Sequence, residues 1–288
     1  MKTKIMLLLV GAFLILSCRT QKNLARNYFL THNINSSQQE QLDALLSRGL
    51  DYEALYTLLG KIKPMSTIRS YSFPIANTDS IKKTKADVLD LDKNQIHLDE
   101  ITNLQHLIGT VDYPDLEFVL YPFQKNRKNR RNLQLVVFKE SLLDSLLETK
   151  ASFFGQFGLV PGTNASIVLS TVENSDRYER LRAYGYLFGY PDYAVDFFVE
   201  AMVEMKENDV LLPRNYFQIP SFSAKEGAFV YAYPKKHIPT KVDSSLYERS
   251  ITLLNHYRDI RQNYLNPDST LKASELLNDY YQSKLIFQ

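Results

Sequence analysis

The stretch of the sequence best suited to ligand chemistry is rich in tyrosine. Tyr178, Tyr184, Tyr190 and Tyr193 lie within sixteen consecutive residues. A phenol ring offers a flat apolar face for stacking and a hydroxyl that donates or accepts a hydrogen bond, and clefts built from such groups bind sugars and peptides. We therefore predict a candidate ligand cleft here. The alternative interpretation is that these rings are core residues at a break between two helices.

Charged side chains would border this cleft, namely Glu173, Asp176, Glu179 and Arg182. Carboxylates at helical spacing are common on protein surfaces, so we assign no acid, base or other catalytic role to any residue. A glycan or peptide hydrolase would require two carboxylates roughly 5 to 9.5 Å apart in a pocket. A flat apolar patch would instead favour a protein partner.

A second candidate contact is cationic, and it lies between two predicted strands. It consists of Lys125, Arg127, Lys128, Arg130 and Arg131. Such a loop could contact lipid phosphates, lipopolysaccharide or an acidic partner. The alternative is a solvated turn that protects the strand edges from aggregation. No aromatic residue is interspersed with the cations, so the sequence does not predict base stacking or nucleic-acid binding.

Motifs whose spacing is imposed by mechanism are missing from the sequence. There is no GxSxG nucleophile elbow, no phosphate-binding P-loop, no dinucleotide-binding GxGxxG and no HExxH zinc motif. Residues 90–101 begin like a calcium loop, but Gln95 replaces the turn glycine and Ile101 replaces the closing carboxylate. His97 and Glu100 would supply two metal ligands at most. We predict no metal and no cofactor.

The single cysteine of the chain lies directly after an apolar N-terminal run. Lys2 and Lys4 precede about twelve apolar residues, whereas a membrane-spanning helix needs roughly twenty. The residues Ile15-Leu16-Ser17-Cys18 resemble the lipobox of bacterial lipoproteins. This resemblance implies a signal peptide over residues 1–17, cleavage before Cys18, and attachment of acyl chains such as palmitate to Cys18. The alternative is an ordinary secreted protein or a membrane helix with a chance cysteine.

The lipobox resemblance also implies a mature protein held at the cell envelope. Cleavage removes two lysines and no acidic residue, which leaves a formally neutral chain, so the acyl chains and not general charge would anchor it. Arg19 and Thr20 follow the cysteine, and no aspartate stands there. By resemblance to lipoprotein sorting in diderm bacteria, this implies the outer membrane in preference to the inner one. Residues 18–36 are polar without a clear period and predict a tether. Residues 37–288 would form the globular domain.

The rest of the chain predicts helices and hairpin-type strands that do not alternate strictly. Helical spacing of apolar residues predicts helices over residues 37–49, 51–59, 99–108, 140–149, 176–188, 191–205, 246–264 and 268–280. Runs of β-prone residues predict strands over residues 68–73, 116–123, 133–138, 166–172 and 228–234. Together these elements predict an α+β fold in one compact body or two packed lobes.

Several local signals predict where these helices begin and end. Ser37 and Glu40 have capping-box spacing, and Gly49 is placed to end the first helix. Ser245 and Glu248 have the same capping spacing before a later helix, and Pro191 suits a first helical position.

The composition is that of an ordinary folded protein, with 44% hydrophobic and 23% charged residues. Together with the anchor and the missing catalytic motifs, it predicts an envelope lipoprotein that works by binding. The expected partner is an envelope protein or a small ligand. The alternative is an envelope hydrolase that acts on glycan or peptide.

Overall fold

The computed structural model describes residues 35–74, 95–124 and 130–282, and within them the chain forms the α+β fold that the sequence predicts. The helices of the described residues are α2 (Ser36–Asp51), α3 (Leu55–Leu58), α4 (Gln95–Gly109), α5 (Glu140–Thr149), α6 (Ala151–Phe154), α7 (Ala165–Asn174), α8 (Arg177–Leu187), α9 (Asp192–Glu207), α10 (Lys241–Arg261) and α11 (Ala273–Tyr281). The strands are β1 (Met65–Pro74), β2 (Leu116–Pro122), β3 (Arg130–Lys139), β4 (Arg214–Ile219) and β5 (Phe229–Pro234).

The larger sheet contains three antiparallel strands in the order β1-β3-β2. β3 pairs along one side with β1 and along the other with β2, so that Val136 lies opposite both Thr67 and Val119. The predicted hairpin of residues 116–123 and 133–138 is therefore confirmed. The run at residues 68–73 lies within β1, which forms one edge of this sheet.

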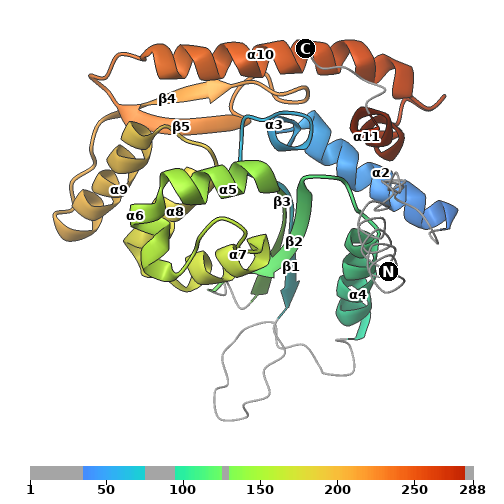
Figure 1. Ribbon diagram of the computed structural model, residues 1–288, viewed down its shortest axis with the longest axis horizontal. Helices are drawn as coiled ribbons and strands as arrows, with labels where there is room; N and C mark the ends of the chain where they lie inside the picture. Colours follow the sequence, from blue (N-terminus) through green and yellow to red (C-terminus); the bar gives the residue numbers. More distant parts are fainter. Residues whose placement is uncertain (1–34, 75–94, 125–129, 283–288) are drawn as a thin grey trace, which may run out of the picture.

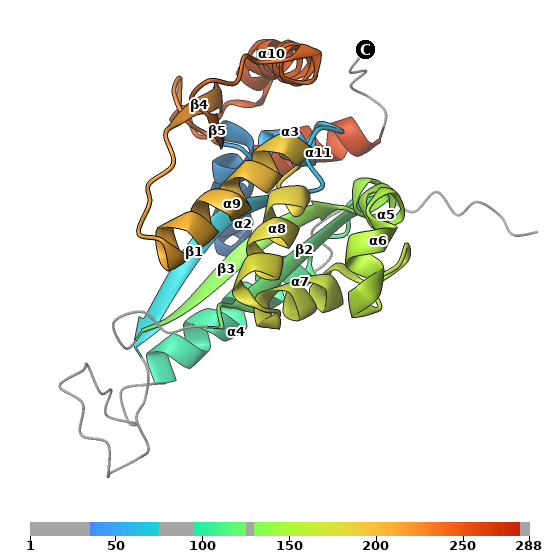
Figure 2. The same cartoon turned by 90° about the vertical axis from the view of Figure 1, so that its left-hand side faces the viewer.

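Both faces of this sheet are covered, and β3 shows why. Leu135 and Val137 point to one side, into a core shared with α2 and α4. Val136 and Phe138 point to the other side, into a core shared with α5, α7 and α8. Figures 1 and 2 show α4 on one face of the sheet and the α5–α8 group on the other. Each fully buried aliphatic side chain of this kind contributes about 1.5 to 3 kcal/mol.

The second sheet is the antiparallel hairpin β4–β5, and α10 runs along it at the top of Figure 1. The buried carboxylate of Asp243 joins three elements here. It accepts hydrogen bonds from the hydroxyls of Tyr193 on α9 (2.5 Å) and Tyr231 on β5 (2.6 Å), and from the backbone N–H of Thr240 (2.6 Å). Burial opposes ionisation, but these donors prevail and lower the pKa of Asp243 below its ordinary value.

The predicted strand at residues 166–172 is wrong, because this segment is the helix α7. Its side chains Val168, Leu169 and Val172 share one helical face and are buried against the sheet. The side chain of Asn164 caps the helix by accepting from the backbone N–H of Ser166 at 3.0 Å. Burial of that face outweighs the β preference of the valine and isoleucine side chains.

The first helix begins and ends elsewhere than its sequence signals predict. Asn35, and not Ser37, is the N-cap, and it forms the capping box with Gln38. Gly49 lies inside α2 and does not end it. A Cβ atom at Gly49 would lie 3.0 Å from Leu58, so this glycine permits close packing of α2 on α3. The predicted second helix is shorter than expected and spans Leu55–Leu58.

Further differences from the predictions concern α10, α9 and β4. The longest described helix, α10, begins five residues early, because Thr240 and Asp243 form its capping box. Pro191 is the N-cap of α9 and not its first residue. The strand β4 was not predicted at all, although it pairs with β5 over its whole length.

Residues 1–34 lie outside the described residues, and with them Cys18, the predicted signal peptide and most of the predicted tether. Among the helices that are described, none combines the length and the apolar character needed to cross a bilayer.

Candidate functional site

A cavity of about 440 Å³ lies between the larger sheet, the helices α8 and α9, and the hairpin β4–β5. We call it the aromatic cavity. The sheet contributes Tyr121 and Gln134, Phe123 follows the end of β2, and the hairpin contributes Tyr216, Val230, Tyr231 and Ala232. The helices and the turn between them contribute Leu181, Tyr184, Phe188, Tyr190, Val195 and Phe198. Its size falls in the range of small-molecule sites, which are mostly apolar with a few oriented polar groups.

One wall of the aromatic cavity is a series of rings in contact. Tyr184 stacks on Phe188 with ring centroids 5.9 Å apart, and Phe188 lies 5.9 Å from Tyr190. Tyr190 in turn lies 5.7 Å from Tyr231. Such ring pairs stabilise one another by about 0.5 to 1.5 kcal/mol beyond simple burial. The wall therefore offers a ligand a continuous, pre-ordered apolar surface.

The other notable feature of the aromatic cavity is a chain of hydrogen bonds at its sheet side. Gln134 Oε1 accepts from the hydroxyl of Tyr121 at 2.8 Å, and that hydroxyl lies 3.1 Å from the hydroxyl of Tyr184. Tyr184 donates to Glu173 Oε2 at 2.6 Å. Glu173 is buried, and its other oxygen accepts from the backbone N–H of Gln124. We call these four side chains the polar end.

Burial dominates the ionisation of the two phenols in the polar end. It raises the pKa of Tyr121 to about 12; the hydrogen bond with Tyr184 opposes this shift, and the nearby Glu173 carboxylate adds to it. It raises the pKa of Tyr184 further, and the neighbouring Tyr121 and Glu173 act in the same direction. Both phenols are therefore neutral at physiological pH and act as hydrogen-bonding groups.

The turn between α8 and α9 brings the rings of the wall together. Gly189 adopts a left-handed conformation with φ of 73°, and a Cβ atom there would lie 3.3 Å from the carbonyl oxygen of Ile62. Gly185 on α8 lies so close to Val195 on α9 that a Cβ atom would be 2.8 Å away. The two glycines allow the helices to approach closely, which places Phe188 and Tyr190 side by side.

A buried lysine supports this wall from behind. Lys63 is fully buried, and its Nζ atom lies 2.6 Å from Glu53 Oε2. The same atom lies 4.4 Å from the ring centroid of Phe229 and 5.4 Å from that of Phe188. Burial lowers the pKa of Lys63, while the charge and hydrogen bond of Glu53 oppose this shift.

The four tyrosines singled out in the sequence lie in different surroundings. Tyr184 and Tyr190 line the aromatic cavity. Tyr193 donates to Asp243 and stacks on His237, with centroids 4.2 Å apart. Tyr178 lies under the ammonium group of Lys206, which is 5.6 Å from its ring centroid.

The charged residues singled out in the sequence also lie in different surroundings. Of the residues expected to border a cleft, Glu173 belongs to the polar end, whereas Arg182 forms an ion pair with Asp196. In the cationic segment, Arg130 donates to Ser72 and Arg131 donates to the carbonyl oxygen of Phe123 at 2.8 Å. Both arginines thus hold backbone or side chains near the end of the sheet. The other cations of this segment, Lys125, Arg127 and Lys128, lie outside the described residues.

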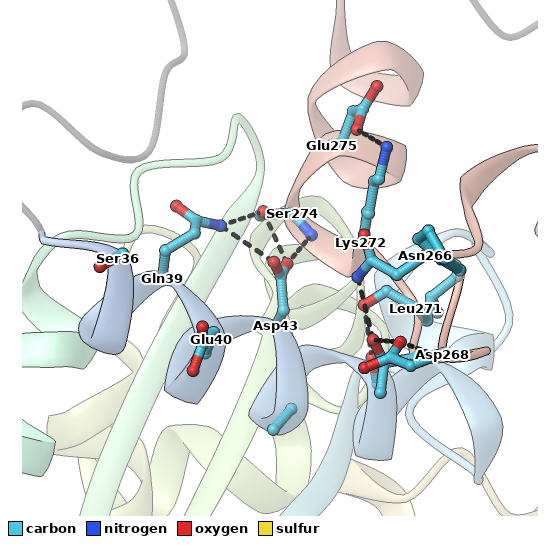
Figure 3. A pocket seen from close by; sticks show the side chains of 14 residues that line it. Ser36, Gln39, Glu40, Asp43, Asn266, Asp268, Leu271, Lys272, Ser274 and Glu275 are labelled. Atoms are coloured by element: carbon cyan, nitrogen blue, oxygen red, sulfur yellow. Dashed lines mark hydrogen bonds and ion pairs between the residues drawn. The ribbon is translucent and has the colours of Figure 1, made fainter.

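A larger and more open groove, of about 1000 Å³, lies between α2 and α11 (Figure 3). Two of its acidic side chains, Asp43 and Asp268, serve structural roles. Asp43 accepts from the backbone N–H and the hydroxyl of Ser274, each at 2.7 Å, and so fixes α11 on α2. Asp268 accepts from Thr270 within a turn. Asp43 and Asp268 therefore serve the fold, and we place no chemistry in this groove.

Within the described ranges, no three histidine, cysteine, aspartate or glutamate side chains are grouped closely enough to hold a metal ion. His97, which the sequence offers as a metal ligand, packs edge-on against Phe73 with centroids 5.7 Å apart.

Sequence reasoning missed the residues that the two sheets contribute to the aromatic cavity. The predicted hairpin contains Tyr121 and Gln134 but gives them no role, and Tyr216 lies on the unpredicted strand β4. The alternating Phe229, Tyr231 and Tyr233 were a usable signal, because alternate residues of a strand share one face. Which helix that face meets depends on contacts between distant parts of the chain.

Comparison with known proteins gives no family assignment. No protein-family model matches the chain, and searches of curated proteins and of solved structures find no significant match.

The ion pair between the buried Lys63 and Glu53 leads to a prediction about stability. Glu53→Gln leaves the ammonium group of Lys63 buried without a counter-charge, which should lower the free energy of unfolding by about 3 kcal/mol. The double variant Glu53→Gln/Lys63→Met should recover most of that loss. Lys63→Met places an unbranched apolar side chain among the rings and leaves the partly exposed Glu53 able to reach water. Denaturant unfolding of the three variants measures each value.

The stability of Glu53→Gln should depend on pH in a defined direction. Without Glu53, the folded-state pKa of Lys63 falls further below its unfolded value of about 10.4, so the unfolded state binds more protons. Stability of Glu53→Gln should therefore rise more steeply than that of the wild type as the pH increases towards about 9. Glu275→Gln, in the exposed pair with Lys272, is the matched control and should change little. An equal loss in both variants would contradict the role given to Lys63.

Proposed function

We propose that this protein is a lipid-anchored protein of the bacterial cell envelope that binds a small, largely apolar ligand in the aromatic cavity. The observation that carries the proposal is the cavity itself, whose wall of stacked rings faces a hydrogen-bonded polar end. Apolar walls supply affinity, and a few oriented polar groups supply selectivity.

The size of the aromatic cavity sets the expected affinity. A ligand that loses about 300 Å² of apolar surface to the wall gains about 7 kcal/mol. Ordering the ligand costs part of this gain, so the dissociation constant should lie between the micromolar and millimolar ranges. The rings are already in contact with one another, so little further cost arises from arranging the protein.

The hydrolase alternative has less support from the same geometry. The described residues that line the aromatic cavity include no aspartate or glutamate, and the carboxylate of Glu173 lies behind Tyr184. A glycoside hydrolase needs two carboxylates facing one another across the substrate. A binding role requires nothing beyond the groups that the cavity contains, and we favour it for that reason.

Binding in the aromatic cavity is tested with a neutral fluorescent probe, N-phenyl-1-naphthylamine, and soluble residues 19–288. The chain contains no tryptophan, so its own emission interferes little. The probe should bind with one site per chain. Val230→Phe adds volume inside the cavity and should weaken binding at least about tenfold, because overfilling an apolar site costs more than 1 kcal/mol.

The matched control for this experiment is Val160→Phe, because Val160 is 56% exposed and lies away from the cavity. It makes the same substitution on the surface and should leave binding unchanged. Probe binding that is absent, or that is equally sensitive to both substitutions, would overturn the proposed use of the cavity.

The anchor is tested separately in cells. The native protein should incorporate labelled palmitate and sediment with membranes, because the residues up to Cys18 resemble a lipobox. Cys18→Ala should lose both the label and the sedimentation, while Cys18→Ala protein should still bind the fluorescent probe. Persistent sedimentation of this variant after a salt wash would mean that the anchor is not an acyl chain on Cys18.

A further inference from the structure

We infer that the ligand of the aromatic cavity is a neutral apolar compound that carries a hydrogen-bond donor, that is, an alcohol or a phenol and not a carboxylate or a phosphate ester. The inference rests on the proposed binding function and specifies its ligand class. The inference has two grounds. One is the number of hydrogen-bond donors within the polar end, and the other is the negative charge of the buried Glu173 carboxylate.

The hydrogen atoms of the polar end are fewer than the oxygens that could accept them. The carboxylate of Glu173 can only accept, so Tyr184 donates to it across 2.6 Å. The hydroxyl of Tyr121 then has one proton and two neighbouring acceptors, the hydroxyl oxygen of Tyr184 at 3.1 Å and Gln134 Oε1 at 2.8 Å.

Tyr121 can satisfy one of these acceptors and not both. Whichever oxygen it leaves belongs to a side chain that lines the aromatic cavity. In the structure, the amide nitrogen of Gln134 is directed to Ser70 Oγ at 3.4 Å. It therefore supplies no proton to the hydrogen bonds of the polar end. A ligand that brings one O–H or N–H group completes the polar end, and one that brings an additional acceptor does not.

The charge behind the polar end selects against anions. The carboxylate of Glu173 contacts Tyr184 directly, and because it is buried its charge is poorly screened. Arg180 lies nearby, but its guanidinium donates to Gln124 Oε1 and to the backbone carbonyl of Glu173. Lys63 lies behind the ring of Phe188, where Glu53 compensates its charge.

An anionic headgroup in the aromatic cavity would therefore face a buried negative charge without a dedicated cation among the described lining residues. Desolvating such a group without a partner is costly. A hydroxyl avoids this cost and supplies the missing proton. The ring series accepts a flat or a flexible apolar body equally well, so the polar end determines the class of ligand.

The experiment compares four compounds that share one ring system: naphthalene, 2-naphthol, 2-methoxynaphthalene and 2-naphthoate. Each displaces N-phenyl-1-naphthylamine from residues 19–288 at neutral pH. We expect 2-naphthol to bind about tenfold more tightly than 2-methoxynaphthalene, which keeps the acceptor oxygen and lacks the proton. We expect 2-naphthoate to bind at least about tenfold more weakly than 2-naphthol.

Two variants assign these preferences to the polar end. Gln134→Leu removes the surplus acceptor, so 2-naphthol and 2-methoxynaphthalene should bind equally while naphthalene binds as before. Gln218→Leu, on an exposed position of β4, is the matched control and should retain the preference. Glu173→Gln removes the charge and should reduce the disadvantage of 2-naphthoate by about tenfold or more.

Each result has one interpretation. Equal binding of 2-naphthol and 2-methoxynaphthalene to the wild type, or tighter binding of 2-naphthoate, would overturn the inferred ligand class and leave the proposed binding function intact. A preference that survives Gln134→Leu would also overturn it, because the donor would then be recognised elsewhere. Failure of all four compounds to displace a probe that binds would overturn the inference too. Failure of the probe itself to bind would overturn the proposed function.

Discussion

The architecture around the aromatic cavity depends on keeping one buried ammonium group away from water. Lys63 lies between the helical hairpin of α2 and α3 and the first strand, and the rings of Phe188 and Phe229 cover its Nζ atom. Glu53 supplies its counter-charge, and Thr57 donates to its backbone oxygen at 3.1 Å. A desolvated charge with a specific partner permits few alternative arrangements of its neighbours. We expect the rings that cover Lys63 to be held in place for this reason, and Phe188 is also part of the cavity wall.

The position of this ion pair explains why the cavity lies where it does. Phe229 belongs to the core beneath α10, whereas Phe188 packs against the core of α5, α7 and α8. Tyr190 contacts both. The two cores meet at the rings of Phe188, Tyr190 and Phe229, and the aromatic cavity is the space beside these rings that neither core fills. Hydrogen bonds then hold the rings at its two ends, Tyr184 through Glu173 and Tyr231 through Asp243. The cavity is thus preformed between the two cores.

The sequence predicted the parts of this arrangement that depend on local physics. The hairpin of β2 and β3 and the break at Gly189 follow from β-prone runs and from helix-ending residues. The helix α7 could not be predicted in this way, because its valines have a local preference for strands. Their burial against the sheet, which favours the helix, depends on distant parts of the chain. The candidate tyrosines show the same limit. Their clustering in the chain is a local property, but Tyr184 and Tyr190 share a cavity with Tyr121 and Tyr231 through contacts across the whole fold.

The central claim is that a ligand enters the aromatic cavity, and tyrosine ring resonances test it most directly. Protein labelled at its tyrosine rings is titrated with 2-naphthol and followed by nuclear magnetic resonance, with single Tyr→Phe variants assigning the signals. The account predicts contacts between naphthol protons and the rings of Tyr184 and Tyr190, which line the cavity. It predicts none to Tyr52, which is 40% exposed and lies beside Arg48 on α2. Contacts at Tyr52 and none at Tyr184 would contradict the account.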